Sequence, residues 1–362
     1  MASAKNTIEL NLVRAGVNQG QSPRLELTRE QLQVVNHRNS QLLVLGSAGS
    51  GKTTTLIAAI SNRISQGFDP NSILAITYGR DSASKLRDQI ASANPALHTV
   101  AEPIARTFHS LAFMILNDPI NLEDSNEKKY VLLSGAEQDA QIRQLLEIDA
   151  ANPSQTLWPA DLRAALTTRG FAKELREFIS RATERGSSPQ ELNKFAKKYE
   201  QSYWPAICQF WEKYKSAMAL RDGTTTHSFN RVDPSELIIL AAEKLESNQR
   251  LLDKYRKMFQ VIYVDEFQES ERAQRKLLHL LSNQELVIFA DPQSAVGRFR
   301  GADPENLLSD LEQFGIKNKI TLQNKLRSEP GQQTVLLSSA SEEANFIAHQ
   351  FRSAHLLSLI HI

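Results

Sequence analysis

Residues 41–60 read QLLVLGSAGSGKTTTLIAAI and decide the fold of this chain. An apolar run enters a glycine-rich turn, and a second run leaves it with apolar residues at helical spacing. Gly46, Gly51, Lys52 and Thr53 stand at the spacing G-x-x-x-x-G-K-[ST], the pattern of a phosphate-binding loop. The strand-like run before the loop and the helical run after it supply the context that this motif requires.

The chemistry expected of this loop is local. Glycines allow tight backbone turns and leave no side chain between the N–H groups and an incoming oxyanion. The following helix adds partial positive charge at its N-terminus, Lys52 offers a point charge to the outer phosphates, and the Thr53 hydroxyl can ligate Mg²⁺. The residues expected to bind a nucleotide here are Gly46, Ser47, Ala48, Gly49, Ser50, Gly51, Lys52, Thr53 and Thr54.

Composition indicates a globular, unexported protein. The 362 residues, 41% of them hydrophobic, suffice for two domains and part of a third. Neither an apolar span of about 18 residues nor a basic-then-apolar leader is present, so we expect a cytoplasmic location and no membrane partner. The single cysteine, Cys208, excludes an internal disulfide and is expected to be a buried small hydrophobe.

The charge balance argues against a global attraction to polyanions. The chain has 42 basic and 41 acidic residues, and its net charge is +1. Any contact with nucleic acid therefore depends on the local placement of side chains.

Gln31 has two possible roles. Residues 27–31 open a helix, and Thr28 with Gln31 fits a capping box. Gln31 also lies about 15 residues before the phosphate-binding loop, where its carboxamide could bind adenine. The two roles compete for one side chain, and the sequence leaves both open.

Alternating strand and helix signals predict a parallel sheet covered by helices. Residues 72–77 are expected to form a strand, residues 81–92 a helix, and residues 104–109 a strand that runs into a turn. Strand-like runs then disappear, and residues 122–246 carry apolar residues at helical spacing, which predicts an all-helical insertion. The strand signal returns in two runs, 260–264 and 286–290.

Acidic residues follow both of the later strands. Asp265 and Glu266 end the first of them, and Asp291 ends the second. In a parallel α/β sheet, ligands gather at the carboxyl ends of the strands, so these residues should meet the phosphate-binding loop. Asp265 could then hold Mg²⁺ while Glu266 orients and deprotonates the attacking water. An acidic pair alone is weak support, but with the loop it predicts nucleoside triphosphate hydrolysis.

Several further segments carry a family resemblance. They are, in chain order, 27–31, 46–54, 77–83, 107–112, 264–270, 290–294, 297–302 and 322–328. In these segments the chain resembles superfamily 1 DNA helicases of the UvrD/Rep/RecB type. Four other segments are similar to helicase-nuclease subunits of the AdnA/AdnB type, namely 133–140, 162–185, 294–296 and 347–356.

The resemblance implies a domain organisation. Residues 23–121 and 247–318 would form a RecA-like ATP-binding domain (1A), and residues 122–246 the helical insertion (1B). Residues 1–22 are expected to be a flexible lead-in. Residues 319–362 would be the truncated start of a second RecA-like domain (2A), and the fold class is α/β.

The resemblance also implies catalytic roles. Lys52 and Thr53 would bind the phosphates and Mg²⁺ of ATP, and Asp265 would be the second Mg²⁺ ligand. Glu266 would be the catalytic base. Gln268 would link the nucleotide state to the DNA groove, and Arg327 would reach the γ-phosphate from a neighbouring domain.

A second group of residues would contact single-stranded DNA. Tyr78, Phe108, His109 and Phe299 match DNA-binding positions of the family, and aromatic rings stack on bases in a sequence-tolerant way. For Tyr78 and Phe299, burial in the core is the open alternative. His109 could instead only cap the turn after its strand.

The chain departs from the family pattern at three places. The family's γ-phosphate sensor is usually glutamine, but this chain has Ser294 there, with Gln293 one place earlier. Either the loop is shifted by one residue and Gln293 is the glutamine at the nucleotide, or the sensor is the weaker hydroxyl of Ser294. Leu326 replaces an aromatic residue that often stacks on adenine, and Glu269 replaces the usual aspartate.

These observations predict an ATP-dependent DNA helicase or translocase that moves 3′ to 5′ on single-stranded DNA in repair or recombination. A second helicase-nuclease subunit would be a further partner. Because later motifs of the second motor domain are missing, we expect the isolated chain to hydrolyse ATP poorly. The end of the chain, residues 358–362, is interpreted as read-through after truncation or as a native strand.

Two other functions remain as alternatives. One is a nucleotide-gated DNA-binding subunit of a helicase-nuclease complex without unwinding activity of its own, which Ser294 and Leu326 favour. The other is a P-loop kinase or small-molecule ATPase, which would leave Tyr78, Phe108 and Phe299 without a purpose.

Overall fold

The computed structural model describes residues 26–94, 104–121, 128–224, 229–282, 285–295, 314–323, 339, 341–342 and 344–348. Its centre is a six-stranded sheet with the order β3-β2-β6-β7-β1-β8, in which every neighbouring pair is parallel. The strands are β1 (Leu42–Gly46), β2 (Ile73–Thr77), β3 (Ala105–Thr107), β6 (Val261–Val264), β7 (Glu285–Ala290) and β8 (Asn318–Leu322). The predicted α/β class with a parallel sheet is confirmed.

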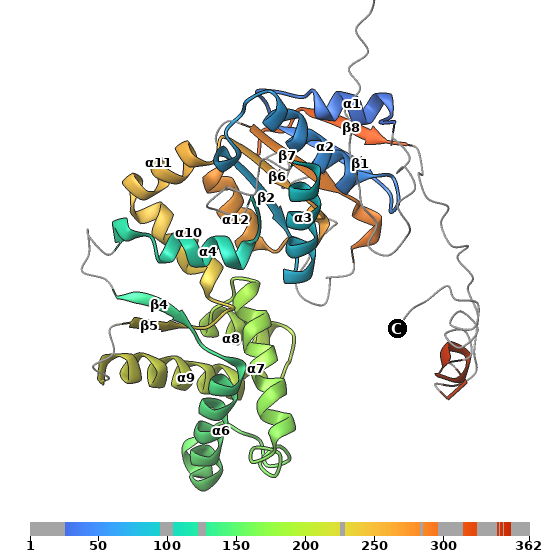
Figure 1. Ribbon diagram of the computed structural model, residues 1–362. Helices are drawn as coiled ribbons and strands as arrows, with labels where there is room; N and C mark the ends of the chain where they lie inside the picture. The colour runs from blue at the N-terminus through green and yellow to red at the C-terminus, as the bar shows by residue number, and fades with distance from the viewer. Residues whose placement is uncertain are drawn as a thin grey trace, which may run out of the picture.

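The inner strands are almost wholly buried because helices cover both faces of the sheet. All five residues of β2 and all six of β7 are buried, as is typical of a parallel sheet covered on both sides. One face packs against α1 (Arg29–Val35), α2 (Lys52–Ser65) and α3 (Arg80–Ala93). The other face packs against α4 (Phe108–Leu116), α10 (Leu237–Ser247), α11 (Gln249–Met258) and α12 (Arg272–Leu281) (Figure 1).

The insertion forms a separate lobe below the sheet, coloured green in Figure 1. It contains α6 (Gly135–Ala151), α7 (Arg169–Glu184), α8 (Pro189–Lys198) and α9 (Trp204–Thr224). These helices enclose their own core, which includes Trp158, Phe210, Trp211 and the buried Cys208. Burial raises the pKa of the Cys208 thiol to about 11, which confirms its expected role as a small buried hydrophobe.

The prediction that the insertion is all-helical is wrong in one respect. Two short strands, β4 (Lys129–Leu132) and β5 (Phe229–Val232), pair in parallel in this region. Only one of their eight residues, Val232, is buried. Each strand is therefore formed by pairing with a partner about a hundred residues away in the sequence, and its own residues give no strong strand pattern.

The packing also moves both predicted boundaries. Helix α10 precedes the expected boundary at 246/247, yet its residues Leu237, Ala241 and Leu245 belong to the core of the sheet domain. Strand β8 spans the expected boundary at 318/319 and pairs with β1. The sheet domain therefore begins again near Val232 and extends at least to Leu322. Residues 1–22 and most of 323–362 lie outside the described residues.

In the part of the chain that the structure describes, four short 3₁₀ helices connect these elements: η1 (Pro70–Ser72), η3 (Pro153–Gln155), η4 (Phe267–Glu269) and η5 (Pro292–Ser294). The last two follow β6 and β7 directly and so lie at the carboxyl edge of the sheet. Within the described ranges, no helix has both the length and the apolar character needed to cross a membrane.

Candidate nucleotide and DNA site

The phosphate-binding loop connects the end of β1 to the start of α2, as expected. Gly49 and Gly51 have φ angles of 81° and 87°, a left-handed conformation that side chains with a Cβ resist. A Cβ at Gly46 would lie 2.3 Å from Oγ of Ser50 and 3.2 Å from its Cβ, so a side chain here would require Ser50 to move. The Ser50 hydroxyl is buried and has no hydrogen-bond partner among the described residues, which suits a loop built to receive an oxyanion.

Lys52 lies over the loop that precedes it. Its Nζ donates to the carbonyl oxygens of Gly46 at 2.7 Å and Ser47 at 3.1 Å. The same nitrogen is 3.8 Å from a carboxylate oxygen of Asp291, which follows β7. The ammonium group is thus placed between the loop and the end of the neighbouring strand.

Asp265 contacts the start of the P-loop helix. Oγ1 of Thr53 donates to Oδ2 of Asp265 at 2.9 Å, and the N–H of Glu266 donates to Oδ1 at 3.1 Å. Asp265 is only 5% exposed, and this desolvation raises the pKa of its carboxyl group. A hydroxyl and a buried carboxylate side by side are the oxygen donors that Mg²⁺ prefers, so these residues fit the metal that the motif implies.

Glu266 is held in an unusual backbone conformation. Its φ angle of 54° is left-handed, which is rare for a residue other than glycine. Its side chain is exposed at the carboxyl edge of the sheet. Desolvation raises the pKa of Glu266, and the negative charges of Asp265 and Glu269 raise it further. A carboxylate with a raised pKa is a stronger base at neutral pH, which suits proton abstraction from water.

Gln268 joins the ends of two strands. Its Oε1 accepts a hydrogen bond from the N–H of Asp291 at 2.9 Å, and its Nε2 donates to Oγ of Ser294 at 3.4 Å. Gln268 is 4% exposed, so it is a buried bridge between the loop after β6 and the loop after β7. The side chain of the neighbouring Gln293 is exposed, while its N–H donates to Oδ1 of Asp291 at 3.2 Å.

Gln31 uses its carboxamide within the protein. Its Oε1 accepts from the N–H of Thr28 at 2.9 Å, and its own N–H donates to Oγ1 of Thr28 at 3.3 Å, which completes the predicted capping box. Its Nε2 donates to the carbonyl oxygen of Ser50 at 3.4 Å. Gln31 therefore ties α1 to the phosphate-binding loop, and its contact with adenine remains a prediction.

The expected DNA contact of Phe108 stays a prediction, and the burial of its ring argues against it. Phe108 is 1% exposed and belongs to the core beneath α4, so its ring has no free face for a base. Tyr78 follows β2, and its ring centroid lies 5.5 Å from that of Phe108. The Tyr78 ring is only partly buried, although its hydroxyl is enclosed. Tyr78 thus retains part of a surface that a base could contact.

His109 is exposed next to Phe108. The alternative expectation was that His109 caps the turn after its strand, but another residue makes the cap there. Oγ1 of Thr107 accepts from the N–H of Ser110 at 3.1 Å and caps α4. Desolvation and the nearby Arg80 lower the pKa of His109, so its ring is neutral at pH 7. Two other expected site residues, Phe299 and Arg327, lie outside the described residues.

Two partners at this edge were not assigned a role from the sequence. Asp291 was placed at the correct edge, but its approach to Lys52 and its bonds to Gln268 depend on how β6 and β7 pair. Ser270, just after the acidic pair, accepts a hydrogen bond from Nε of Arg275 at 2.9 Å. No local pattern in the sequence marks this contact.

Comparison with known proteins is consistent with this geometry. DNA helicase II of Haemophilus influenzae is 27% identical over 310 residues, which are 83% of this chain and 38% of that protein. ATP-dependent DNA helicase PcrA of Bacillus subtilis is 28% identical over 303 residues, 82% of this chain and 37% of that protein. DNA helicase II of Escherichia coli is 26% identical over 305 residues, 83% and 38% respectively. The chain thus spans less than two fifths of the length of these relatives.

A family model described as the UvrD/REP helicase N-terminal domain matches residues 27–315. This match includes the phosphate-binding loop, the acidic pair after β6 and the whole insertion. Because it covers far more than half of the sequence, the chain belongs to the UvrD/REP helicase N-terminal domain family.

Proposed function

We propose that this chain binds ATP with Mg²⁺ and couples ATP hydrolysis to 3′ to 5′ movement along single-stranded DNA, in DNA repair or recombination. The observation that carries the proposal is the meeting of Lys52, Thr53 and Asp265 at one sheet edge, with Glu266 adjacent. The names of the similar proteins, DNA helicase II and ATP-dependent DNA helicase PcrA, support the same function.

Each residue at the edge has a part in this proposal. When bound, ATP supplies the phosphoryl group for transfer, and Mg²⁺ offsets its negative charge. Lys52 turns its ammonium group to the outer phosphates, and Thr53 and Asp265 provide oxygen ligands for the metal. Glu266 orients the attacking water and accepts its proton. The residue proposed to complete the charge stabilisation is Arg327, from the domain that follows.

Movement on DNA requires a connection between the nucleotide and the strand. Gln268 is the proposed connection, since it joins the loop that carries Glu266 to the loop after β7. The proposed DNA surface lies at the carboxyl ends of β2 and β3, where Tyr78 and His109 are found. Phe299 is proposed to add a stacking ring.

A nucleotide-gated DNA-binding subunit is the second candidate function. Ser294, at the expected sensor position, donates to the carbonyl oxygen of Asp291 at 3.2 Å and accepts from Gln268. Its hydroxyl is thus already engaged within the protein, which favours a weak response to the γ-phosphate. Such a subunit would belong to a complex of the AdnA/AdnB type with a second helicase-nuclease subunit, and its proposed location is the cytoplasm.

The test is ATP turnover by the chain with and without single-stranded DNA. The decisive variant is Glu266→Gln, and Glu246→Gln is the control because Glu246 is an exposed carboxylate paired with Lys276. A motor loses DNA-stimulated turnover in Glu266→Gln and keeps it in Glu246→Gln. Nucleotide-dependent DNA affinity without any turnover in the wild-type chain would fit both the gated subunit and a motor that lacks its second domain, because this chain is expected to hydrolyse ATP poorly on its own. Equal turnover in Glu266→Gln and the wild type would refute the assigned base.

A further inference from the structure

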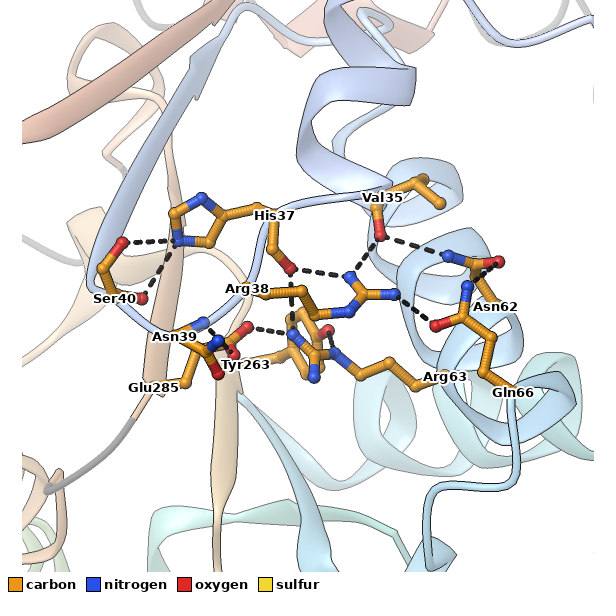
Figure 2. Close-up of polar contacts among 10 residues, drawn as sticks. All are labelled: Val35, His37, Arg38, Asn39, Ser40, Asn62, Arg63, Gln66, Tyr263 and Glu285. Carbon is orange, nitrogen blue, oxygen red and sulfur yellow. Dashed lines mark hydrogen bonds and ion pairs between the residues drawn. The ribbon is translucent and has the colours of Figure 1, made fainter. Parts of the chain in front are cut away.

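A second polar cluster lies at the opposite edge of the sheet, away from the nucleotide site. Figure 2 shows its members converging on Arg63, near the end of α2. Nε of Arg63 donates to the Tyr263 hydroxyl at 2.8 Å, and one terminal nitrogen donates to the carbonyl oxygen of His37 at 3.0 Å. The same nitrogen forms an ion pair with Glu285. Arg63 is 4% exposed, Tyr263 1% and Glu285 5%, so this is a buried network.

The three side chains belong to the elements that carry the nucleotide site. Arg63 is on α2, which begins with Lys52 and Thr53. Tyr263 is on β6, two residues before Asp265. Glu285 is the first residue of β7, which ends one residue before Asp291. The network therefore joins the same helix and strands that present the phosphate and metal ligands, and Arg63 and Glu285 lie at the ends of α2 and β7 that are far from those ligands.

Helix α2 and strand β7 can transmit a shift from the network to the nucleotide site. The eleven residue-to-residue steps from Lys52 to Arg63 span about 16 Å of helix. The strand from Glu285 to Ala290 spans about 17 Å. A regular helix and a buried strand are stiff over such lengths, so a shift of α2 against β7 at Arg63 changes the distance between Lys52 and Asp291. Misplacement of about 1 Å at a site can lower its function by about a hundredfold.

The network fixes the orientation of the Arg63 guanidinium group and also balances its charge. Burial raises the pKa of Tyr263 to about 12, so its hydroxyl stays protonated. Oε2 of Glu285 accepts from the N–H of Asn39 at 2.9 Å, just before β1. The planar guanidinium of Arg63 is thus fixed by three partners on three different segments. Lysine cannot reproduce this geometry.

We propose that Arg63, Tyr263 and Glu285 form a clamp that sets the position of the P-loop helix against β6 and β7, and thereby the affinity of the nucleotide site. The proposal rests on the proposed function, because it assumes that this site binds a nucleotide. All three are positioning residues, since none of them reaches the ligand. The alternative is that the cluster contributes only to stability.

The experiment measures two quantities for each variant of the full chain: the Kd for a fluorescent ADP analogue with Mg²⁺, and the melting temperature without nucleotide. The variants are Arg63→Met, Glu285→Gln, Tyr263→Phe and the double variant Arg63→Met/Glu285→Met. Tyr263→Phe removes one hydroxyl and keeps the ring in the core. The double variant removes both charges, which restores much of the stability lost with one buried charge left unpaired.

A matched control exists elsewhere in the same domain. Asp118 is 5% exposed, pairs with Nζ of Lys254, and accepts from the Tyr255 hydroxyl at 3.0 Å. Like the clamp, this cluster joins a buried carboxylate to a cation and a tyrosine hydroxyl, although its cation, Lys254, is 36% exposed. Its residues lie on α11 and just after α4, which carry no nucleotide ligand. Lys254→Met and Asp118→Asn should therefore lower the melting temperature and leave the Kd unchanged.

The clamp predicts that Arg63→Met and Glu285→Gln weaken ADP binding by roughly twofold to thirtyfold, with a smaller loss in Tyr263→Phe. In the double variant, stability recovers and affinity does not. An affinity that recovers together with stability, or an unchanged Kd in the folded variants, overturns the clamp alone. Should a single variant fail to fold, Tyr263→Phe and the double variant decide the question. A wild-type chain that does not bind the ADP analogue overturns the proposed function and the clamp together.

Discussion

The left-handed backbone at Glu266 predicts an inverted order of stability for two substitutions. A residue with a Cβ costs about 1–2 kcal/mol in this conformation, and glycine avoids that cost. At ordinary positions alanine is instead more stable than glycine by about 0.5–1 kcal/mol, because glycine loses more backbone entropy on folding. At residue 266, Glu266→Gly should therefore be more stable than Glu266→Ala by roughly 1 kcal/mol, or about 2 °C in melting temperature.

The assay compares urea or thermal unfolding of both variants with the same pair at Glu269. Glu269 ends the 3₁₀ helix that follows Glu266 and is not among the left-handed residues, so Glu269→Ala should be more stable than Glu269→Gly. Both variants at 266 lack the carboxylate and should lose ATP turnover, whatever their stability. If alanine is the more stable substitution at both positions, Glu266 is not strained and the reasoning fails.

Three further outcomes are expected. Asp265→Asn should raise the melting temperature of the nucleotide-free protein at pH 7 and abolish stabilisation by Mg²⁺ with nucleotide. The raised pKa of Asp265 means that the folded state holds the proton more tightly than the unfolded state does. The increase in melting temperature of Asp265→Asn over the wild type should therefore shrink as the pH falls through the folded pKa of Asp265. Melting curves at several pH values measure this change. Phe108→Leu should keep wild-type affinity for single-stranded DNA because the ring is buried. Phe108→Ala should lower the free energy of unfolding by about 3–5 kcal/mol. Weaker DNA binding by a fully folded Phe108→Leu in a fluorescence titration would contradict the buried position of the ring. Lys52→Ala should abolish binding of a fluorescent ADP analogue, and retained binding in the same titration would exclude the loop as the phosphate site.

The parts of the fold that follow from local sequence could be predicted. The loop at 46–54 contains all of its determinants within nine residues, and the buried strands after it are continuous apolar runs. The strands at 129–132 and 229–232 could not be predicted, because they are short, mostly unburied and formed by pairing over long separation. The assignment of α10 failed for a related reason. Helical spacing shows that a helix has an apolar face, but it does not show which core that face joins.

The features of the site that follow from local sequence could also be predicted, and those that depend on tertiary packing could not. Residues adjacent in the motifs, such as Lys52, Asp265 and Glu266, were placed correctly at the carboxyl edge of the sheet. The burial of Phe108 could not be predicted, because the motif is the same whether its ring points into the core or into a groove. The pair of Arg63 and Glu285 is separated by 222 residues, so only the paired sheet brings it together. Its members carry no motif of their own.

The two carbonyl bonds of Lys52 make phosphate binding an exchange rather than an addition. In the proposed cycle, the ammonium group leaves the oxygens of Gly46 and Ser47 when it turns to a phosphate, and it regains them when that phosphate departs. The carbonyl oxygens of the loop therefore compete with the phosphates of the nucleotide for the Lys52 ammonium group. In the proposed cycle, such competition weakens the binding of the hydrolysed nucleotide. The hydrogen bonds from Lys52 to the loop thus assist nucleotide release.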